Sequence, residues 1–209
     1  MNLTYEKDNK ERVPFEHYLE EYKTKDPFEI SRRTGFPYLE EERCFQVSFF
    51  GKEYRISFPE YEIQCLEEGY SPLLSQTAAR ILVIRFLIEG CQAVTTGKFL
   101  TYREVPWGEV YFRQFQGRCM MRLAYGYGSR LEAFSEKMEK LGAVLVPAAD
   151  KGYQFEVFPG FYVQFLLWEG DEEFPPSSQI LFSDNFPAAF HAEDLVVVCD
   201  IGITTLKAI

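Results

Sequence analysis

The densest set of side chains that could do chemistry is acidic and lies in the C-terminal third of the chain. Carboxylate oxygens bind Ca²⁺ or Mg²⁺ when several of them converge on one point, and two carboxylates in unlike surroundings can act as general acid and general base. A neighbouring carboxylate could also orient a histidine as a base. The candidate carboxylate site comprises Asp171, Glu172, Glu173, Asp184, His191 and Glu193.

The spacing of these acidic residues also permits a purely structural interpretation. Successive side chains of an extended segment point to opposite faces, so at most two or three of the carboxylates can converge. The D-x-D-x-D-G pattern of a calcium-binding loop is absent from the sequence. A solvated strand exit, with Gly170 making the turn, explains the acidic block without a ligand.

A second set of side chains could bind a small molecule. Aromatic residues make up 17% of the chain, which is enough to wall a flat apolar pocket and also enough to fill a core. Arg118 and Arg122 share one face if they lie on a helix, where they could clamp an anion or pair with the protein's own carboxylates. The candidate ligand-binding residues are Trp107, Tyr127, Trp168, Arg118 and Arg122.

The cysteine and histidine patterns assign neither a catalytic residue nor a metal ligand. The five cysteines, at positions 44, 65, 91, 119 and 199, contain no C-x-x-C pair, which favours free thiols that pack as small buried side chains. His17 and His191 are too few for a multi-histidine centre. The Gly126-Tyr127-Gly128-Ser129 segment lacks the lysine of a phosphate-binding loop. The cofactor therefore stays open.

Hydrophobic periodicity predicts the elements that must position these side chains. We expect helices over residues 13–22, 27–34, 71–90 and 129–141, and another where Phe112, Phe115, Cys119 and Leu123 recur every three or four residues. We expect strands over 45–50 and 53–58, joined at Gly51-Lys52, and over 143–146, 153–158 and 162–168, with a short apolar segment at 180–182.

Capping patterns and the C-terminal segment complete the predicted fold. Thr101 with Glu104, and Ser129 with Glu132, fit the capping box of a helix start. Residues 193–206 mix β-branched side chains with an acidic start, and we predict a helix there. Helices and hairpins are segregated along the chain, which indicates an α+β fold: a single domain over residues 1–209 with a mainly antiparallel sheet packed against helices.

The charge of the chain limits its partners. The 22 basic and 32 acidic residues give a net charge of −10, which disfavours binding to nucleic acid and to an anionic membrane surface. The longest apolar run, over residues 81–88, is far shorter than the roughly 20 residues of a spanning helix, and the polar N-terminus does not look like a secretory signal. We expect a cytoplasmic protein.

The C-terminal third resembles a known family. The stretch Trp168-Glu169-Gly170-Asp171-Glu172-Glu173-Phe174-Pro175-Pro176, the later Ile180-Leu181-Phe182 and Glu193-Asp194-Leu195 are similar to the signature of a domain-of-unknown-function family of anaerobic bacteria and archaea. Members of that family sometimes stand beside iron–sulfur or corrinoid-linked modules. The resemblance implies an anaerobe's cytoplasm and an iron–sulfur or corrinoid partner protein, and we expect Trp168 and Phe182 to share one hydrophobic interior.

Three functional hypotheses follow. The first is a non-enzymatic accessory or small-ligand-binding protein of anaerobic metal or corrinoid metabolism, which requires an aromatic-lined cavity of a few hundred cubic ångströms. The second is a metal-dependent or acid–base hydrolase, which requires the carboxylates to converge in one cleft. The third is an interaction module that docks on an iron–sulfur or corrinoid protein through an exposed apolar patch. The oligomeric state is not predicted.

Overall fold

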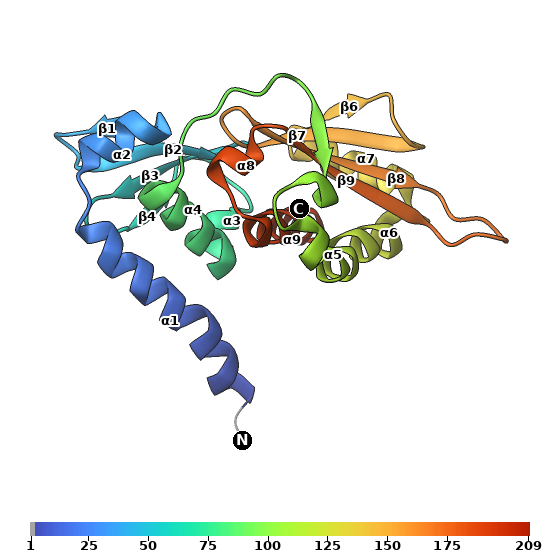
Figure 1. The fold of residues 1–209 in the computed structure, drawn as a ribbon, viewed down its shortest axis with the longest axis horizontal. Coiled ribbons are helices and arrows are strands. Elements are labelled where there is room, and N and C mark those ends of the chain that lie inside the picture. The colour runs from blue at the N-terminus through green and yellow to red at the C-terminus, as the bar shows by residue number, and fades with distance from the viewer. Residues whose placement is uncertain (1–2) are drawn as a thin grey trace. The chain divides into compact units, whose positions relative to one another are not determined.

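The computed structural model describes residues 3–209, with side chains described from residue 12 onward (Figure 1). The chain divides into two compact units at Gln92 and Ala93, and each unit has its own antiparallel sheet and its own helices. The predicted α+β class is therefore confirmed. That residues 1–209 form a single domain stays a prediction, and each unit is described by itself.

The first unit is built on a four-stranded antiparallel sheet in the order β1-β2-β3-β4. Its strands are β1 (Tyr38–Leu39), β2 (Cys44–Phe49), β3 (Lys52–Ser57) and β4 (Ile63–Cys65). The helices are α1 (Leu3–Lys23), α2 (Pro27–Thr34), α3 (Pro72–Ser75) and α4 (Thr77–Glu89). The helix predicted over 71–90 is thus broken, because Gln76 adopts an extended conformation with φ −126°.

The predicted hairpin between β2 and β3 is present, with its turn one residue earlier than expected. Phe49 pairs with Lys52, so Phe50 and Gly51 form the two-residue loop. Both have positive φ, 50° and 69° respectively, as the favoured hairpin turn requires. Phe50, which we expected at the end of the first strand, is therefore the first residue of the loop. Gly51, which we expected as the first loop residue, is the second.

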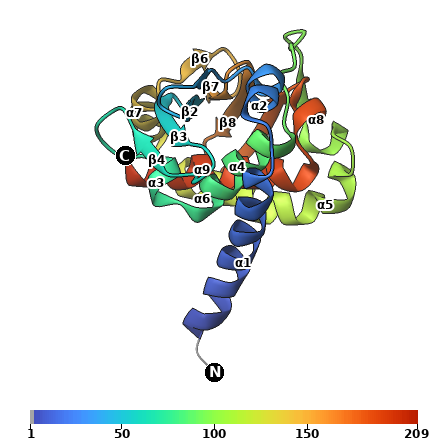
Figure 2. The same cartoon turned by 90° about the vertical axis from the view of Figure 1, so that its left-hand side faces the viewer.

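Alternation along β2 and β3 gives the first unit its core. Phe45, Val47, Tyr54 and Ile56 are all fully buried on one face of the sheet. The Tyr22 ring of α1 packs edge-on against Phe58 at 5.1 Å between ring centroids. Figure 2 turns this unit toward the viewer, and α1 lies against α4 in both ribbon views.

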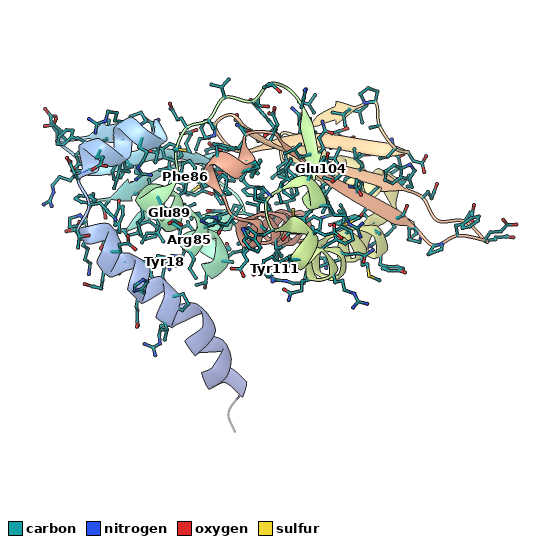
Figure 3. All side chains as sticks on the ribbon, in the orientation of Figure 1. Tyr18, Arg85, Phe86, Glu89, Glu104 and Tyr111 are labelled. Carbon is teal, nitrogen blue, oxygen red and sulfur yellow. The ribbon has the colours of Figure 1, made fainter. Side chains whose placement is uncertain are left out.

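Two arginines stabilise the helices of the first unit. Arg33 donates hydrogen bonds to the carbonyls of Leu87 (2.8 Å) and Ile88 (2.9 Å), so it satisfies acceptors that the end of α4 leaves without helical partners. Arg85 lies 5.5 Å from the centroid of the Tyr18 ring and donates to Glu89 at 2.9 Å (Figure 3). The contact between Tyr18 of α1 and Arg85 of α4 therefore joins these helices.

The second unit contains a five-stranded antiparallel sheet in the order β5-β9-β8-β7-β6. Its strands are β5 (Phe99–Thr101), β6 (Val144–Val146), β7 (Lys151–Phe158), β8 (Phe161–Trp168) and β9 (Ser177–Ser183). The helical segments are η1 (a 3₁₀ turn, Tyr102–Glu104), α5 (Gly108–Phe115), η2 (a π-helical turn, Gln116–Met120), α6 (Met121–Tyr127), α7 (Leu131–Lys140), α8 (Phe186–Ala189) and α9 (Ala192–Ala208).

One face of this sheet is the core of the second unit. Val163, Phe165, Ile180 and Phe182 are all fully buried on it. Trp168 pairs with Ser177 at the other end of the β8–β9 hairpin and is 38% exposed. Trp168 and Phe182 thus belong to adjacent strands of one unit, but Phe182 is in the core and Trp168 is at its margin.

The local helix signals had mixed outcomes. The helix predicted over 193–206 is confirmed as α9. Thr101 and Glu104 form the predicted capping box, with 2.7 Å between the Thr101 nitrogen and the Glu104 carboxylate, although they open a 3₁₀ turn. The capping box predicted for Ser129 and Glu132 is wrong, because α7 begins at Leu131 with Arg130 as its N-cap. Within residues 3–209, no helix has the length and apolar character needed to cross a membrane.

The core assignment predicts a sharp contrast between neighbouring residues of β8. Phe165→Ala should lower the free energy of unfolding by about 3–5 kcal/mol, because a fully buried ring is replaced by a cavity. Gln164→Ala, on the opposite face of the same strand, should cost less than about 1 kcal/mol because it removes only a hydrogen bond to Gln154. Urea unfolding followed by far-UV circular dichroism measures both. Equal losses would contradict the assignment of the two faces.

Candidate functional site

The central feature of the second unit is a π-helical turn inside its long helical segment. Phe115, Cys119, Leu123 and Tyr127 are all buried, and they are spaced by four residues. In an α-helix each four-residue step drifts by about 40° around the axis, since there are 3.6 residues per turn. In a π turn the chain rotates less per residue about the helix axis. This smaller rotation compensates for the drift and keeps the buried side chains facing the core. The Met121 N–H accordingly donates to the carbonyl of Gln116, five residues earlier.

An open groove lies between this helical segment and the start of β9. It has a volume of about 180 Å³, and we call it the α6–β9 groove. Its lining residues are Gln116, Met120, Met121, Ala124, Tyr125, Pro176, Ser177 and Ser178. Met121 is 47% and Tyr125 61% exposed, so a thioether and a phenol ring are presented to solvent. Both α6 and β9 are labelled on the right of Figure 1.

The floor of the groove is fixed by one hydrogen bond between the helix and the strand. The Ser178 hydroxyl donates to the carbonyl of Met120 at 2.7 Å, at the last residue of the π turn. Ser178 is itself 8% exposed. This bond holds the start of β9 against the helical segment beside the α6–β9 groove.

The far wall of the groove depends on a close approach between Pro176 and two glycines. A Cβ atom added to Gly128 would lie 2.3 Å from Pro176 Cβ, and one added to Gly170 would lie 2.6 Å from Pro176 Cδ. Those distances leave no room for any side chain at either position. The packing of Pro176 therefore accounts for the glycine at position 128 of the Gly126–Ser129 segment without a phosphate ligand.

The acidic block forms a tight turn at the tip of the β8–β9 hairpin. Asp171 accepts hydrogen bonds from the backbone N–H groups of Glu173 (2.8 Å) and Phe174 (2.7 Å). These bonds favour the ionised form and lower the pKa of Asp171 below its ordinary value. Glu172 and Glu173 are exposed. The block is thus the solvated strand exit that we weighed against a metal site.

The candidate carboxylate residues do not converge. Asp171 precedes β9 and Asp184 follows it, so a strand of seven residues, about 23 Å long, separates them. Among the described residues, no group of three or more His, Cys, Asp and Glu side chains could hold a metal ion. The hypothesis of a hydrolase centred on Asp171, Glu173, Asp184, His191 and Glu193 requires convergence in one cleft, and this separation does not favour it.

Asp184, His191 and Glu193 serve local structure on the far side of β9. Asp184 accepts hydrogen bonds from the Thr95 hydroxyl (2.6 Å), the Thr96 N–H (3.0 Å) and the Thr96 hydroxyl. His191 is the N-cap of α9, and Glu193 is an exposed residue of its first turn. His191 therefore begins a helix, as its simpler interpretation required.

The candidate ligand-binding residues are also dispersed. Trp107 is 75% exposed at the N-cap of α5, about 14 Å along the helical segment from the groove residue Gln116. Tyr127 is buried against Phe134, with 5.7 Å between ring centroids. Trp168 pairs with the groove residue Ser177 across the β8–β9 hairpin.

The two candidate arginines bind a carboxylate of the chain itself. Arg118 lies 3.5 Å from Asp200 of α9, and Arg122 pairs with the same carboxylate and donates to Thr204 at 2.7 Å. One carboxylate thus joins both cations to α9. The internal ion pairs that we weighed against an anion clamp are present.

A second hollow lies on the first unit and differs in chemistry. It has a volume of about 280 Å³ on the outer face of the sheet, and its lining includes Glu42, Arg55 and Gln64 but no aromatic residue. Arg55 and Glu42 form an ion pair at 2.6 Å. Neither this hollow nor the α6–β9 groove, with its one tyrosine, is the aromatic-lined cavity expected for a planar ligand.

The cysteines are free thiols. Cys44, Cys119 and Cys199 are buried, whereas Cys65 and Cys91 are half-buried. Burial raises the pKa of Cys199, and its side chain is hydrogen-bonded to Cys119. The raised pKa makes the Cys199 thiol a poor nucleophile, which fits packing better than catalysis.

The comparisons with known proteins identify a family and nothing closer. A family model with the description "domain of unknown function (DUF3786)" matches residues 26–205, which covers most of both compact units. No curated protein and no solved structure matches the chain.

The packing of Pro176 predicts opposite effects for two glycines of the same segment. Gly128→Ala should lower the free energy of unfolding by about 1–3 kcal/mol, because its Cβ overlaps Pro176 and the carbonyl of Ala124. Gly126→Ala is the matched control: its Cβ meets nothing within 4 Å, and alanine should stabilise α6 by about 0.5–1 kcal/mol. Urea unfolding measures both changes. A neutral Gly128→Ala would contradict the close approach.

The Asp184 bonds predict a pH dependence of stability. They lower the pKa of Asp184 below its ordinary value of 3.8, so their contribution is complete above that value and is lost as the pH falls toward the lower folded pKa. Asp184→Asn should therefore flatten the decline of the thermal midpoint between about pH 5 and pH 2.5. The double variant Thr95→Val, Thr96→Val removes the hydroxyl donors and should flatten it too. A variant that declines as steeply as the wild type would refute the role of this carboxylate.

Proposed function

Since the chain belongs to the DUF3786 family of domains of unknown function, we propose its role from the site itself: it is a non-enzymatic interaction module that docks a partner protein on the α6–β9 groove. The observation that carries this proposal is the half-exposed apolar lining, with Met121 and Tyr125 presented beside a π turn. Methionine side chains adapt to differently shaped partners, and π turns occur frequently at functional sites.

The surroundings of the groove extend the apolar surface. Phe174, which is 67% exposed, stands two residues before the groove residue Pro176. Aromatic residues and methionine are enriched at protein interfaces, and aromatic rings bury large areas with few rotatable bonds. An open groove with such a margin suits a protein partner better than a small molecule, which requires burial of most of its surface.

We also propose the class of partner that the family resemblance implies. It is an iron–sulfur or corrinoid protein of an anaerobic metabolism, and the partner would hold the cofactor. The cysteine spacing supports this division of roles, because it offers no cluster-binding pair. The five free thiols suit a reducing compartment such as the cytoplasm.

Site-specific photocrosslinking tests the docking proposal. A benzophenone amino acid placed at Tyr125, in cells that make the protein, should yield a discrete covalent adduct whose mass identifies one partner. The same group at Val110, which is 70% exposed on α5 outside the groove, is the matched control and should yield no such adduct. Met121→Asp should reduce the Tyr125 adduct at least tenfold, because burial of a new charge opposes docking.

The folding of the variant must be separated from its binding. Met121 is half-exposed, so Met121→Asp should keep the wild-type urea midpoint to within about 0.5 kcal/mol. Equal adducts at positions 110 and 125, or an adduct that Met121→Asp leaves unchanged, would rule out the groove as the docking site.

A further inference from the structure

Half of one edge of β9 has no strand beside it. β9 pairs with β8 from Ser177 to Phe182, whereas β5 pairs only with Leu181, Phe182 and Ser183. After Thr101 the chain leaves the sheet and enters the 3₁₀ turn η1. Within the part of the chain that the structure describes, residues 177–180 therefore have no strand partner on the side that β5 occupies further along.

This open edge has hydrogen-bonding capacity and begins at the groove. In an antiparallel sheet, alternate residues of a strand direct their N–H and C=O groups to opposite sides. Every second residue of 177–180 therefore presents its backbone groups to the side of β9 that lacks a strand. Ser177 and Ser178 of this edge line the α6–β9 groove, and Met121 and Tyr125 of α6 line its opposite side. Four residues of strand span about 13 Å, which suits a segment of four or five residues.

The charge beside the open edge is negative. Glu169, Asp171, Glu172 and Glu173 are exposed at the hairpin tip, just before Pro176. Among the described residues none of these four carboxylates forms an ion pair.

Three arginines of the neighbouring helical segments have partners elsewhere in the second unit. Arg118 and Arg122 pair with Asp200. Arg130 donates to the carbonyl of Gly126 and lies 5.9 Å from the centroid of the Tyr127 ring. The tip therefore offers unneutralised negative charge to whatever enters the groove.

We propose that the partner docks by β-strand addition: an extended segment with lysine or arginine next to alternating apolar side chains pairs with residues 177–180 of β9. Its backbone completes the vacant edge, its apolar side chains enter the α6–β9 groove, and its cations face the acidic tip. This inference rests on the proposed function and specifies the chemistry of the segment that the groove accepts.

Peptide selection tests the inference. A phage-displayed library of random heptapeptides is selected on the wild-type protein and counter-selected on Met121→Asp. The enriched sequences should be net positive with apolar residues at alternate positions. Synthetic copies with N-methyl groups on alternate backbone nitrogens keep every side chain but lose strand hydrogen bonds. These copies should bind at least tenfold more weakly in one of the two methylation registers.

Matched charge variants test the role of the tip. The triple variant Glu169→Gln, Glu172→Gln, Glu173→Gln keeps Asp171, whose carboxylate closes the turn, and should weaken the enriched peptides at least fivefold. Glu40→Gln, Glu41→Gln, Glu60→Gln changes the net charge equally at exposed sites of the first unit and should leave binding unchanged.

The outcomes separate this inference from the proposed function. Enriched peptides that are neutral or acidic, or that tolerate N-methylation in both registers, overturn strand addition of a basic segment. Failure to enrich any peptide that distinguishes wild type from Met121→Asp overturns it as well. In each case a Tyr125 photoadduct that Met121→Asp abolishes would still support docking at the groove, whereas loss of that adduct would overturn both.

Discussion

The second unit depends on keeping one face of a long helical segment in its core. Phe115, Cys119, Leu123 and Tyr127 recur at intervals of four, which a regular α-helix cannot hold on one face over so many turns. The π turn resolves this conflict, and the position of α6 follows from it. The π turn sets how the following helix is rotated about its axis. As a result Met120, Met121, Ala124 and Tyr125 face β9. The groove is thus a by-product of core packing.

The hairpin tip is the second part of this arrangement. Pro176 fits between Gly128 and Gly170, and Asp171 closes the turn with its carboxylate. Gly128 and the acidic run, which the sequence offered as candidates for ligand binding, therefore meet at one structural junction. This junction accounts for these residues without assigning them a reaction.

Hydrophobic periodicity and capping patterns predicted most of the secondary structure. They did not predict the contacts between elements that are distant in the sequence. The alternation of Phe45, Val47 and Phe49 gave β2, and the acidic start at Glu193 gave the helix α9. The Ser129 capping box failed because Tyr127 and Gly128 extend the previous turn. Four-residue spacing carried the signal for the π turn, but we took it as an ordinary helix. The groove could not be predicted, because Met121 and Pro176 are 55 positions apart and meet only through the fold.

The vacant edge of β9 also bears on how copies of this protein treat one another. An unpaired strand edge is a template for association between identical chains. Here the edge is short, two prolines precede it, and a cluster of carboxylates stands at its entrance. Two copies that approached edge to edge would set like charges against each other, while proline would deny them the first hydrogen bonds of a ladder. The carboxylates that would attract a basic segment therefore also oppose association between copies of this protein.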